Sequence, residues 1–484
     1  MSAGDSRPPS GRESIPRDAG PHGGLDHITP YDRLVWTDDE VERLLASGEQ
    51  RQELEAYFGA QEYRELARLA RAARGAPHAA GTCRTFIVPG VLGSQLGVPR
   101  RDPLPRDILW LDPIDIGYGR LTELALPGAT AVRPYGVLLY SYLGLKLRLR
   151  AAGVDAVFHP YDWRLGIEEL GRALARRVQE EPVPKVAIVA HSLGGLVSRA
   201  ALAHRAGGKV ERLVLLGTPN RGSLAALQAL RGTYWAVRKL AQLDVLHSAE
   251  ALASALFNTF PSLYDMLPHT EPGDSLDLHD PTAWPPSGPQ PVPALLESAR
   301  AVHRALAPPD ERFACVAGTG QGTATAVTRR GRDFVYTVTR HGDGTVPVES
   351  ARLGVRNYIA AVKHSDLTRD RTVAAAVVDL LRSGSTRRLS SQWKSRSRAE
   401  ARVSDTELGK LTASKVDWSS LSADERRVFL EYLNEPPQLR LRVPERAGTS
   451  ERTGPTGRAG PAARAGRTGH DGRPGRTGPT RRRR

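Results

Sequence analysis

Residues 184–195 read Pro-Lys-Val-Ala-Ile-Val-Ala-His-Ser-Leu-Gly-Gly. The run Lys185–Ala190 is apolar enough for a buried strand, and a helical pattern follows directly. A serine between small residues, here Ala190 and Gly194, at a strand-to-helix turn is typical of a nucleophile elbow. Small residues are needed because the two backbones nearly touch, although glycine is commoner than alanine at the first position. The stretch therefore predicts Ser192 as a nucleophile in front of a helix N-terminus, whose dipole favours an oxyanion.

The sequence around this stretch alternates between short apolar runs and amphipathic helical segments, which argues against a chance match of the serine motif. The apolar runs are Thr85–Val88, Ala156–His159, Lys185–Ala190, Arg212–Leu216, Arg312–Ala317, Phe334–Val338 and Asn357–Val362. The helical segments include Tyr140–Ala152, Glu168–Glu180, Leu193–Arg205 and Thr372–Arg382. This alternation predicts an α/β fold, with a mostly parallel sheet and helices on both faces.

A nucleophilic serine needs a base, and the base needs a carboxylate that orients it. The expected chain order is serine, acid, histidine, each just past a strand end. Asp343 follows the run Phe334–Val338, and His364 follows the run Asn357–Val362. Taken singly, they could belong to an Asp-Gly turn and a surface loop, but their order behind the elbow favours a catalytic pair. His341 is the competing base, less favoured because it shares a loop with the carboxylate.

An oxyanion hole needs two backbone N–H groups, one from the residue after the nucleophile and one from a loop after an early strand. Leu193 supplies the first. Residues 85–94 read Thr-Phe-Ile-Val-Pro-Gly-Val-Leu-Gly-Ser, a strand that ends in a glycine-rich loop. The backbone of such a loop can approach a ligand closely, although taken alone the loop could equally be a plain turn.

Several motifs resemble those of the lecithin:cholesterol acyltransferase-like family, in the same order. They are Val88–Leu96 (VPGVLGSQL), Trp110–Pro113 (WLDP), Tyr161–Arg164 (YDWR), Ala190–Gly195 (AHSLGG), Gly342–Pro347 (GDGTVP) and His364. The resemblance covers residues 82–384, and YDWR and GDGTVP are its most specific parts, since the elbow alone fits any α/β-hydrolase.

The resemblance implies an α/β-hydrolase fold and a set of functional residues. Ser192 is the implied nucleophile, with Asp343 and His364 as its partners. The implied oxyanion donors are Leu92 and Leu193, and the implied substrate-binding residues near the active site are Asp162 and Trp163.

The segment 220–309 is too long for a simple crossover and predicts a largely helical cap or lid. Its first half is rich in large apolar residues, which could form a small core of the cap or line a lipid-sized pocket. They are Leu224, Leu227, Leu230, Trp235, Val237, Leu240, Leu243, Leu246, Leu252, Leu256 and Phe257. The signal peptides and disulfides of the family's secreted members are not expected here, so a plasma-lipoprotein role is not implied. We recognise none of the family's motifs in the cap segment, so the lipid substrate stays open.

The N-terminal part of the chain precedes the first apolar run. Residues 1–30 are polar and rich in proline and glycine, so we expect them to be disordered. Residues 31–77 predict a helical extension, with a capping box at Thr37 and Glu40 and a second helix over Glu49–Arg74. No chemistry is expected from this extension.

The C-terminal part is expected to be a linker over 385–445 with one short helix, followed by an Arg/Gly/Pro-rich disordered tail over 446–484. The tail has eleven arginines against Glu451 and Asp471, so it carries +9 of the net +15. It can attract phosphate or anionic lipid, which makes peripheral contact with a membrane an option. It contains no aromatic residue for base stacking, so nucleic acid is not an expected partner.

The composition of the 484 residues limits the remaining classes. Two cysteines exclude a disulfide framework and a cysteine-rich zinc module. No apolar run reaches the roughly 18 residues of a membrane span, and residues 1–30 show no secretory signal, so a cytoplasmic protein is expected.

Two further patterns fall in the cap segment. Gly273–Leu276 spells GDSL, the signature of another esterase class, but no strand precedes it. Asp277, His279 and Asp280 are potential metal ligands, yet no second cluster in the sequence completes a site. We therefore expect neither a metal nor a cofactor.

Together these patterns predict a serine-dependent O-acyltransferase that acts on lipid esters through an acyl-enzyme. The expected partners are a lipid ester donor and an alcohol or water acceptor. With water alone as acceptor, the enzyme would be a lipase, phospholipase or carboxylesterase. A binding module on an inactive hydrolase fold is the alternative from a different class.

Overall fold

The fold is described by a computed structural model. It places residues 36–77, 81–99, 107–128, 131–269, 276–393, 399–411, 414–436 and 439–442. The expected disordered N-terminus (1–30), the basic tail (446–484) and residues 273–275 of the GDSL motif lie outside the described residues. Within the ranges given, every helix is too short or too polar to cross a lipid bilayer.

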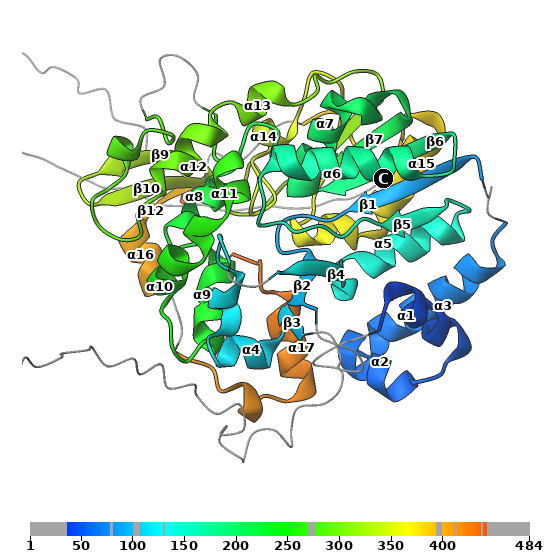
Figure 1. The fold of residues 1–484 in the computed structure, drawn as a ribbon, viewed down its shortest axis with the longest axis horizontal. Coiled ribbons are helices and arrows are strands. Elements are labelled where there is room, and N and C mark those ends of the chain that lie inside the picture. The colour runs from blue at the N-terminus through cyan, green and yellow to red at the C-terminus, as the bar shows by residue number, and fades with distance from the viewer. Residues whose placement is uncertain are drawn as a thin grey trace, which may run out of the picture. The chain divides into compact units, whose positions relative to one another are not determined.

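A six-stranded parallel sheet forms the centre of the protein, in the order β11-β8-β7-β6-β1-β5. Figure 1 labels four of these strands, β1, β5, β6 and β7. Its strands are β1 (Cys83–Val88), β5 (Ala156–Phe158), β6 (Lys185–His191), β7 (Val210–Leu216), β8 (Phe313–Gly318) and β11 (Arg356–Ala360). All but one of the predicted apolar runs lie in this sheet, and the predicted α/β fold is confirmed. β6 pairs with β1 and β7, so Ser192 emerges at the middle of the sheet.

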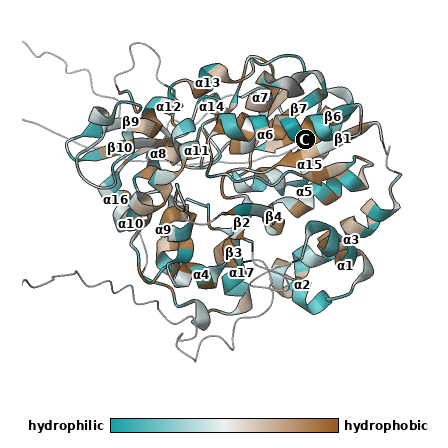
Figure 2. Cartoon of the chain, viewed as in Figure 1, coloured by the Kyte–Doolittle hydropathy of each residue, from teal (hydrophilic) through white to brown (hydrophobic). Residues whose placement is uncertain are grey.

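Alternate side chains of the strands enter two separate cores, one on each face of the sheet. Ile188 and Leu213 belong to the core with α6 and α7, whereas Val189 and Val214 belong to the core with α5 and α15. Successive residues of a strand point to opposite faces, which produces this division. The covering helices are amphipathic or apolar, as the colours of Figure 2 show. They are α5 (Leu139–Ala151), α6 (Ile167–Glu180), α7 (Leu193–Ala203) and α15 (Arg371–Ser383).

Two antiparallel sheets flank the central sheet. One has the order β3-β2-β4 and the other β12-β10-β9. The strands are β2 (Ser94–Val98), β3 (Asp107–Trp110), β4 (Arg133–Val137), β9 (Thr323–Arg330), β10 (Asp333–Thr339) and β12 (Glu400–Ser404). Short helices α4 (Pro113–Gly117) and α14 (Val348–Ala351) complete this part of the fold.

The placement of Phe334–Val338 in the parallel sheet was wrong, because this run forms β10 of an antiparallel hairpin. Buried and half-buried residues alternate along β10, the pattern of a strand with one solvated face. Arg330 pairs with Asp333 across the turn, where Gly331 has a φ of 58°. A positive φ in a two-residue hairpin turn favours glycine.

The segment expected to be a linker contributes to the folded protein. Within it, β12 pairs with β10, and two helices follow, α16 (Asp405–Lys410) and α17 (Ala423–Glu431). The prediction of a linker is therefore wrong for β12 and α16, which are part of the folded protein. The sequence gives little sign of β12, because it is an edge strand with one fully buried residue, Val403, and it begins within the serine- and arginine-rich segment 383–402.

Residues 220–309 lie between β7 and β8 and are mostly short helices, as predicted for a cap. The helices are α8 (Leu224–Leu230), α9 (Trp235–Leu243), α10 (Ala249–Ala255), α11 (Pro261–Asp265), α12 (Pro293–Ala299) and α13 (Val302–Ala305). In Figure 1, α8 lies beside β9 and α9 lies beside α4. Their buried apolar residues join the core of α6 and α7, so the cap is packed onto the fold rather than hinged away from it.

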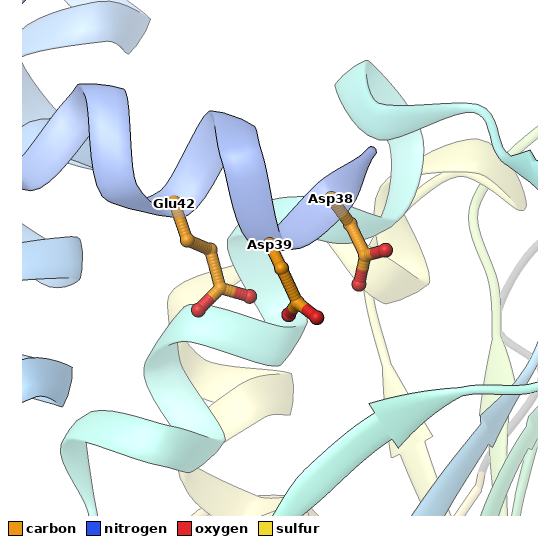
Figure 3. A group of neighbouring side chains, drawn as sticks. All are labelled: Asp38, Asp39 and Glu42. Carbon is orange, nitrogen blue, oxygen red and sulfur yellow. The ribbon is translucent and has the colours of Figure 1, made fainter. Parts of the chain in front are cut away.

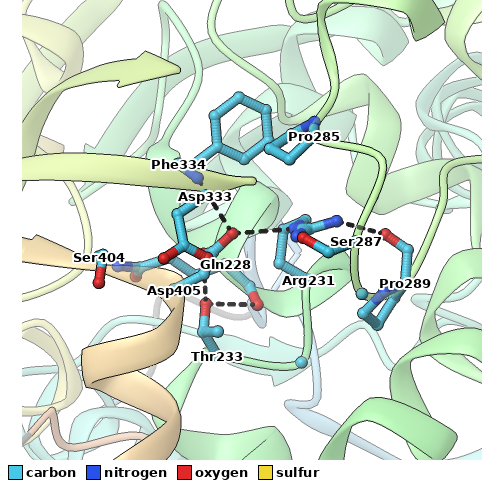
Figure 4. A network of polar contacts seen from close by, with 12 residues as sticks. Gln228, Arg231, Thr233, Pro285, Ser287, Pro289, Asp333, Phe334, Ser404 and Asp405 are labelled. Carbon is cyan, nitrogen blue, oxygen red and sulfur yellow. Dashed lines mark hydrogen bonds and ion pairs between the residues drawn. The ribbon is translucent and has the colours of Figure 1, made fainter. Parts of the chain in front are cut away.

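A buried ion pair ties the cap to the C-terminal segment (Figure 4). Arg231, just after α8, lies 3.0 Å from Asp405 of α16, and it donates to the carbonyl of Pro289 at 2.7 Å. Tyr336 of β10 donates to the other oxygen of Asp405 at 2.9 Å. The side chains of Arg231 and Asp405 are 3% and 8% exposed, so each charge depends on the other for solvation.

Arg231→Met is expected to lower the free energy of unfolding by about 3–5 kcal/mol, because it leaves the Asp405 carboxylate buried without its counter-charge. Urea unfolding measures the loss. Arg172→Met is the matched control, since the pair of Arg172 with Glu168 is exposed by half or more and such pairs contribute about 1 kcal/mol or less. Equal losses in the two variants would contradict this role for Asp405.

The N-terminal extension consists of α1 (Asp38–Ser47), α2 (Arg51–Phe58) and α3 (Ala60–Gly75). The predicted capping box of Thr37 and Glu40 is confirmed. The predicted second helix is divided in two by Gly59, whose φ of 81° no α-helix can continue through.

Three carboxylates at the start of α1 lie within 4.8 Å of one another, those of Asp38, Asp39 and Glu42 (Figure 3). The ammonium group of Lys146 on α5 lies among them, 2.7 Å from Glu42 and 3.4 Å from Asp39. Burial lowers the pKa of Lys146, but Glu42 and Asp38 outweigh it and the net shift is upward. Lys146 is the cation of this cluster, and the ion pairs join α1 of the extension to α5 of the α/β domain.

Candidate active site

Ser192 lies at the sharp turn between β6 and α7, as the motif predicts. Its φ of 53° and ψ of −126° are unusual for a residue other than glycine. Two backbone hydrogen bonds of 2.9 Å hold it there, from its own N–H to Leu216 and from the N–H of Gly195 to its carbonyl. The serine is 5% exposed. Such strain at one polar residue is typical of a functional site.

The two glycines after Leu193 are required by contact with neighbouring segments. A Cβ on Gly194 would lie 2.6 Å from the carbonyl oxygen of Val88, and one on Gly195 would lie 2.7 Å from the Cβ of Thr218. A Cβ on Gly90 would likewise lie 2.9 Å from that of Ser192. The glycine-rich loop after β1 therefore passes directly beside the serine.

Asp343 and His364 form a direct pair. Nδ1 of His364 lies 2.8 Å from Oδ2 of Asp343, and the His364 N–H donates to the Asp343 carbonyl at 2.9 Å. The other carboxylate oxygen accepts from the N–H groups of Thr345 (3.0 Å) and Val346 (2.7 Å). The side chains are 1% and 13% exposed. The aspartate is thus held from both sides and can orient the imidazole.

This pair lies next to the elbow. Gly217 follows Leu216, which binds the Ser192 N–H, and a Cβ on Gly217 would lie 3.0 Å from Nδ1 of His364 and 3.1 Å from Oδ2 of Asp343. The rings of His191 and His364 are 4.7 Å apart. The structure therefore brings the predicted serine, acid and base together, and their catalytic roles stay predictions.

His341, the competing base, has a different environment. Its ring packs edge-on against Trp393 at 5.6 Å, and its N–H donates to the hydroxyl of Thr339. The Asp343 carboxylate is paired with His364 instead. The geometry favours His364.

A residue that the sequence reasoning missed, His191, connects the two sides of the site. The N–H of Gly90 donates to the Tyr142 hydroxyl at 2.9 Å, and this hydroxyl lies 3.0 Å from Nδ1 of His191. Nε2 of His191 lies 3.1 Å from the carbonyl of His364. The Tyr142 O–H can donate to Nδ1, and the Nε2–H of a neutral His191 to the carbonyl. Its position directly before Ser192 was the available signal.

His191 is expected to make the protein sensitive to acid. Burial, and then the neighbouring His364, lower the pKa of His191 well below its usual 6.5. The unfolded chain therefore binds a proton in the window below pH 6.5 that the folded chain does not, and stability falls as the pH drops through it. His191→Gln should reduce this slope in unfolding experiments between pH 7 and 5. His204→Gln is the control, and an unchanged slope for His191→Gln would contradict the assignment.

The loop expected to carry the second oxyanion donor is held by three buried side chains. Trp110 donates to the carbonyl of Leu92 at 2.8 Å, and Tyr161 donates to that of Pro89 at 2.8 Å, besides the contact of Tyr142. Leu92 has a φ of 63°, and it lines the cavity at Ser192. The arrangement is suited to a preorganised donor.

The cavity beside Ser192 is narrow and almost entirely apolar. Its volume is about 40 Å³. The polar groups that reach it are few, and among them the Tyr234 hydroxyl lies 3.5 Å from the Thr345 hydroxyl. Cap residues form much of the wall: Ala225, Ala226, Ala229, Ala236, Val237, Phe257, Phe260, Leu263 and Met266. A substrate chain can enter only if some of these side chains move.

The two residues expected to bind substrate lie in different places. Trp163 lines the cavity, and its indole N–H donates to the Ser94 carbonyl at 3.0 Å. Asp162 instead forms a buried two-point pair with Arg164 at 2.6 and 2.8 Å, and Arg164 donates further to the carbonyl of Leu124. Asp162 supports the loop and does not line the cavity.

Comparison with known proteins gives one family match. The sequence model of lecithin:cholesterol acyltransferase matches residues 152–288, which include the YDWR and AHSLGG motifs and most of the cap. No curated protein sequence matches the chain.

Solved structures similar to the chain include three lipolytic enzymes. The mature form of lipase BlEst2 from Bacillus licheniformis is 16% identical, over 64% of this chain and 95% of that chain, with a TM-score of 0.33. Lipase B of Aspergillus fumigatus is 13% identical, over 78% and 70%, with a TM-score of 0.32. Phospholipase PlaB of Legionella pneumophila is 12% identical, over 63% and 57%, with a TM-score of 0.28. The parallel sheet and the strand-to-helix elbow at Ser192 form an α/β-hydrolase fold, and residues 152–288 of the chain are similar to lecithin:cholesterol acyltransferase.

Proposed function

We propose that the protein is a serine-dependent O-acyltransferase that acts on lipid esters through an acyl-enzyme. The match to lecithin:cholesterol acyltransferase supports an enzyme of lipid-ester chemistry, either a hydrolase or an acyltransferase. The observation that carries the proposal is the cavity at Ser192, whose wall is formed by apolar cap residues, Trp163 and Leu92. An apolar wall beside a nucleophile suits an acyl chain.

In the proposed reaction His364 takes the proton of the Ser192 hydroxyl while the oxygen attacks the ester carbonyl. The N–H groups of Leu92 and Leu193 bind the oxyanion, and Asp343 orients His364 and stabilises its charged form. The donor alcohol leaves with the proton from His364, and Ser192 carries the acyl group as an ester. An acceptor alcohol then gives its proton to His364 and attacks the carbonyl of the acyl-enzyme. The bond between Ser192 Oγ and the acyl carbon breaks, His364 returns the proton to Oγ, and the new ester leaves.

The choice between an alcohol and water depends on how dry the acyl-enzyme is kept. The test supplies a phospholipid with a labelled acyl chain together with a long-chain alcohol or a sterol, and measures acylated alcohol against free fatty acid. The transferase is supported if the ratio of acylated alcohol to free fatty acid exceeds the ratio of alcohol to water in the assay. Free acid alone, across a broad panel of alcohols, would make the protein a lipase or phospholipase.

We further propose that the protein is a cytoplasmic enzyme in peripheral contact with lipid. The basic tail 446–484 would attract it to anionic membranes. An arginine near an anionic bilayer can contribute about 1 kcal/mol before the chain entropy is subtracted. Deleting the tail is expected to weaken binding to phosphatidylserine vesicles, with a difference that fades as salt screens it, and to leave hydrolysis of soluble short-chain esters unchanged. Sedimentation with vesicles measures this, and equal binding of both proteins would exclude a membrane role for the tail.

A further inference from the structure

A chain of buried hydrogen bonds runs between the two sides of the candidate active site. Tyr142 lies on α5 and His191 is the last residue of β6, and they are 4% and 8% exposed. The Tyr142 hydroxyl lies 2.9 Å from the N–H of Gly90 and 3.0 Å from Nδ1 of His191. Nε2 of His191 lies 3.1 Å from the carbonyl of His364. We call these four residues the hydrogen-bond relay.

The two ends of the relay fix the direction of every hydrogen bond in it. The N–H of Gly90 can only donate, so the Tyr142 oxygen accepts and its own proton is left for Nδ1 of His191. When Nδ1 accepts, a neutral imidazole carries its proton on Nε2, where it faces the carbonyl of His364, which can only accept. Burial, and then the neighbouring His364, lower the pKa of His191 and keep the ring neutral. Each polar atom of the two side chains therefore has a partner in one arrangement of protons.

One end of the relay is the loop expected to carry an oxyanion donor. The Gly90 carbonyl accepts from the N–H of Gly93 at 3.1 Å, which closes a turn around Val91 and Leu92. A Cβ on Gly93 would lie 2.8 Å from the Tyr142 hydroxyl oxygen. The Tyr142 hydroxyl therefore contacts both ends of the turn that holds Leu92.

The other end is the backbone of the proposed base. The His364 N–H donates to the Asp343 carbonyl at 2.9 Å, and the His364 carbonyl lies against His191, so this residue is held on both sides. Helix α5 holds the same loop a second time, since the Ser141 carbonyl accepts from the hydroxyl of Thr368 at 2.8 Å. Two consecutive residues of α5, this serine and the tyrosine after it, thus contact the loop of the base and the oxyanion loop.

We propose that Tyr142 and His191 are positioning residues for the reaction. They hold the oxyanion donor Leu92 in register with the base His364. The proposal rests on the proposed function, in which both groups act on one ester carbonyl. Neither positioning residue lines the cavity at Ser192, so each acts through the groups it holds and not through contact with substrate. Groups fixed in advance need no reorganisation in the transition state, and a misplacement of about 1 Å can cost roughly 100-fold in rate.

The first variant is Tyr142→Phe, which keeps the buried ring and removes only the hydroxyl. It leaves the Gly90 N–H without its acceptor and Nδ1 of His191 without its donor. For a soluble short-chain ester, kcat is expected to fall about 10- to 100-fold, with KM within about twofold of the wild-type value. His191→Leu removes both ring nitrogens and should have the same effect. His191→Gln should retain more of kcat, because an amide can accept and donate at once.

Tyr264→Phe is the matched control. The Tyr264 hydroxyl is also buried, accepts from the Val292 N–H at 2.9 Å and donates to the Asn258 carbonyl at 2.9 Å, but it does not line the cavity. This variant should lose stability as Tyr142→Phe does and keep kcat within about twofold. In the double variant Tyr142→Phe/His191→Leu, kcat should fall no further than in the more affected single variant, because both changes break one relay.

A second measurement needs no catalytic activity. Amide hydrogen exchange over residues 88–93, followed by mass spectrometry, should be faster in Tyr142→Phe than in the wild type, because the Gly90 N–H loses its acceptor. Exchange over the same residues should be unchanged in Tyr264→Phe.

Three results would overturn the proposal. They are a kcat in Tyr142→Phe no lower than in Tyr264→Phe, losses of kcat that multiply in the double variant, and exchange over residues 88–93 that Tyr142→Phe does not change. A wild-type chain with neither ester turnover nor fluorophosphonate labelling would instead contradict the proposed function. Exchange would still decide in that case whether the Tyr142 hydroxyl holds the loop.

Discussion

Replacing Ser192 by alanine is expected to remove ester turnover by about four to six orders of magnitude and to abolish labelling by a fluorophosphonate. The proposed acyl-enzyme forms on the Ser192 hydroxyl, which alanine lacks. Melting temperature should change little because the alanine keeps the backbone and loses one oxygen. An unlabelled wild-type chain would support the inactive binding module instead.

The partners of Ser192 are tested in the same assay. His364→Ala and Asp343→Asn should each cost several orders of magnitude, because the three residues act as a unit and the Asp343–His364 pair is 2.8 Å long. His341→Ala is the matched control, since its ring packs on Trp393. Retained activity in His364→Ala together with loss in His341→Ala would show that the base is His341.

Gly194→Ala is expected to give a protein that is either unfolded or inactive, although Ser192, Asp343 and His364 are unchanged. The added Cβ would lie 2.6 Å from the Val88 carbonyl and closer still to that of Pro89, and both are backbone atoms that no side-chain rotation can move. Relief requires α7 to separate from the loop after β1, which pulls Leu193 away from Leu92. Activity, melting temperature and soluble yield measure the effect.

The control for this prediction is Gly354→Ala. Gly354 has no atom within 4 Å of an added Cβ and no positive φ, so the substitution should be near neutral. If Gly194→Ala matched Gly354→Ala in both stability and activity, the close approach of the elbow to the oxyanion loop would not be required.

Much of the fold and the candidate site could be predicted from local patterns. Strand β6, the turn at Ser192 and the helix after it lie within one continuous stretch, so the sequence periodicity and the small residues report them directly. The capping box at Thr37 is equally local. Asp343 and His364 were predicted as the acid and the base because each follows a strand, although β10 before Asp343 belongs to an antiparallel sheet.

Other features depend on which distant segments meet. The alternation of apolar residues in Phe334–Val338 predicts a strand, but it does not show which strand lies beside it. One neighbour in the sheet is β12, which comes from a segment with the composition of a linker. Asp162 and Trp163 are adjacent in sequence, yet one side chain pairs with Arg164 and the other lines the cavity. Neighbouring residues in a loop can point in different directions, and the sequence does not record which.

The sequence by itself determined the α/β class, the elbow at Ser192 and the positions of Asp343 and His364 just past two later strands, because these depend on spacing along a few adjacent elements. Only the tertiary structure decided that His191 joins Gly90 to His364 and that Arg231 meets Asp405. Each of these contacts joins segments that are distant in sequence. Such contacts follow from how the whole chain packs, and no local pattern encodes them.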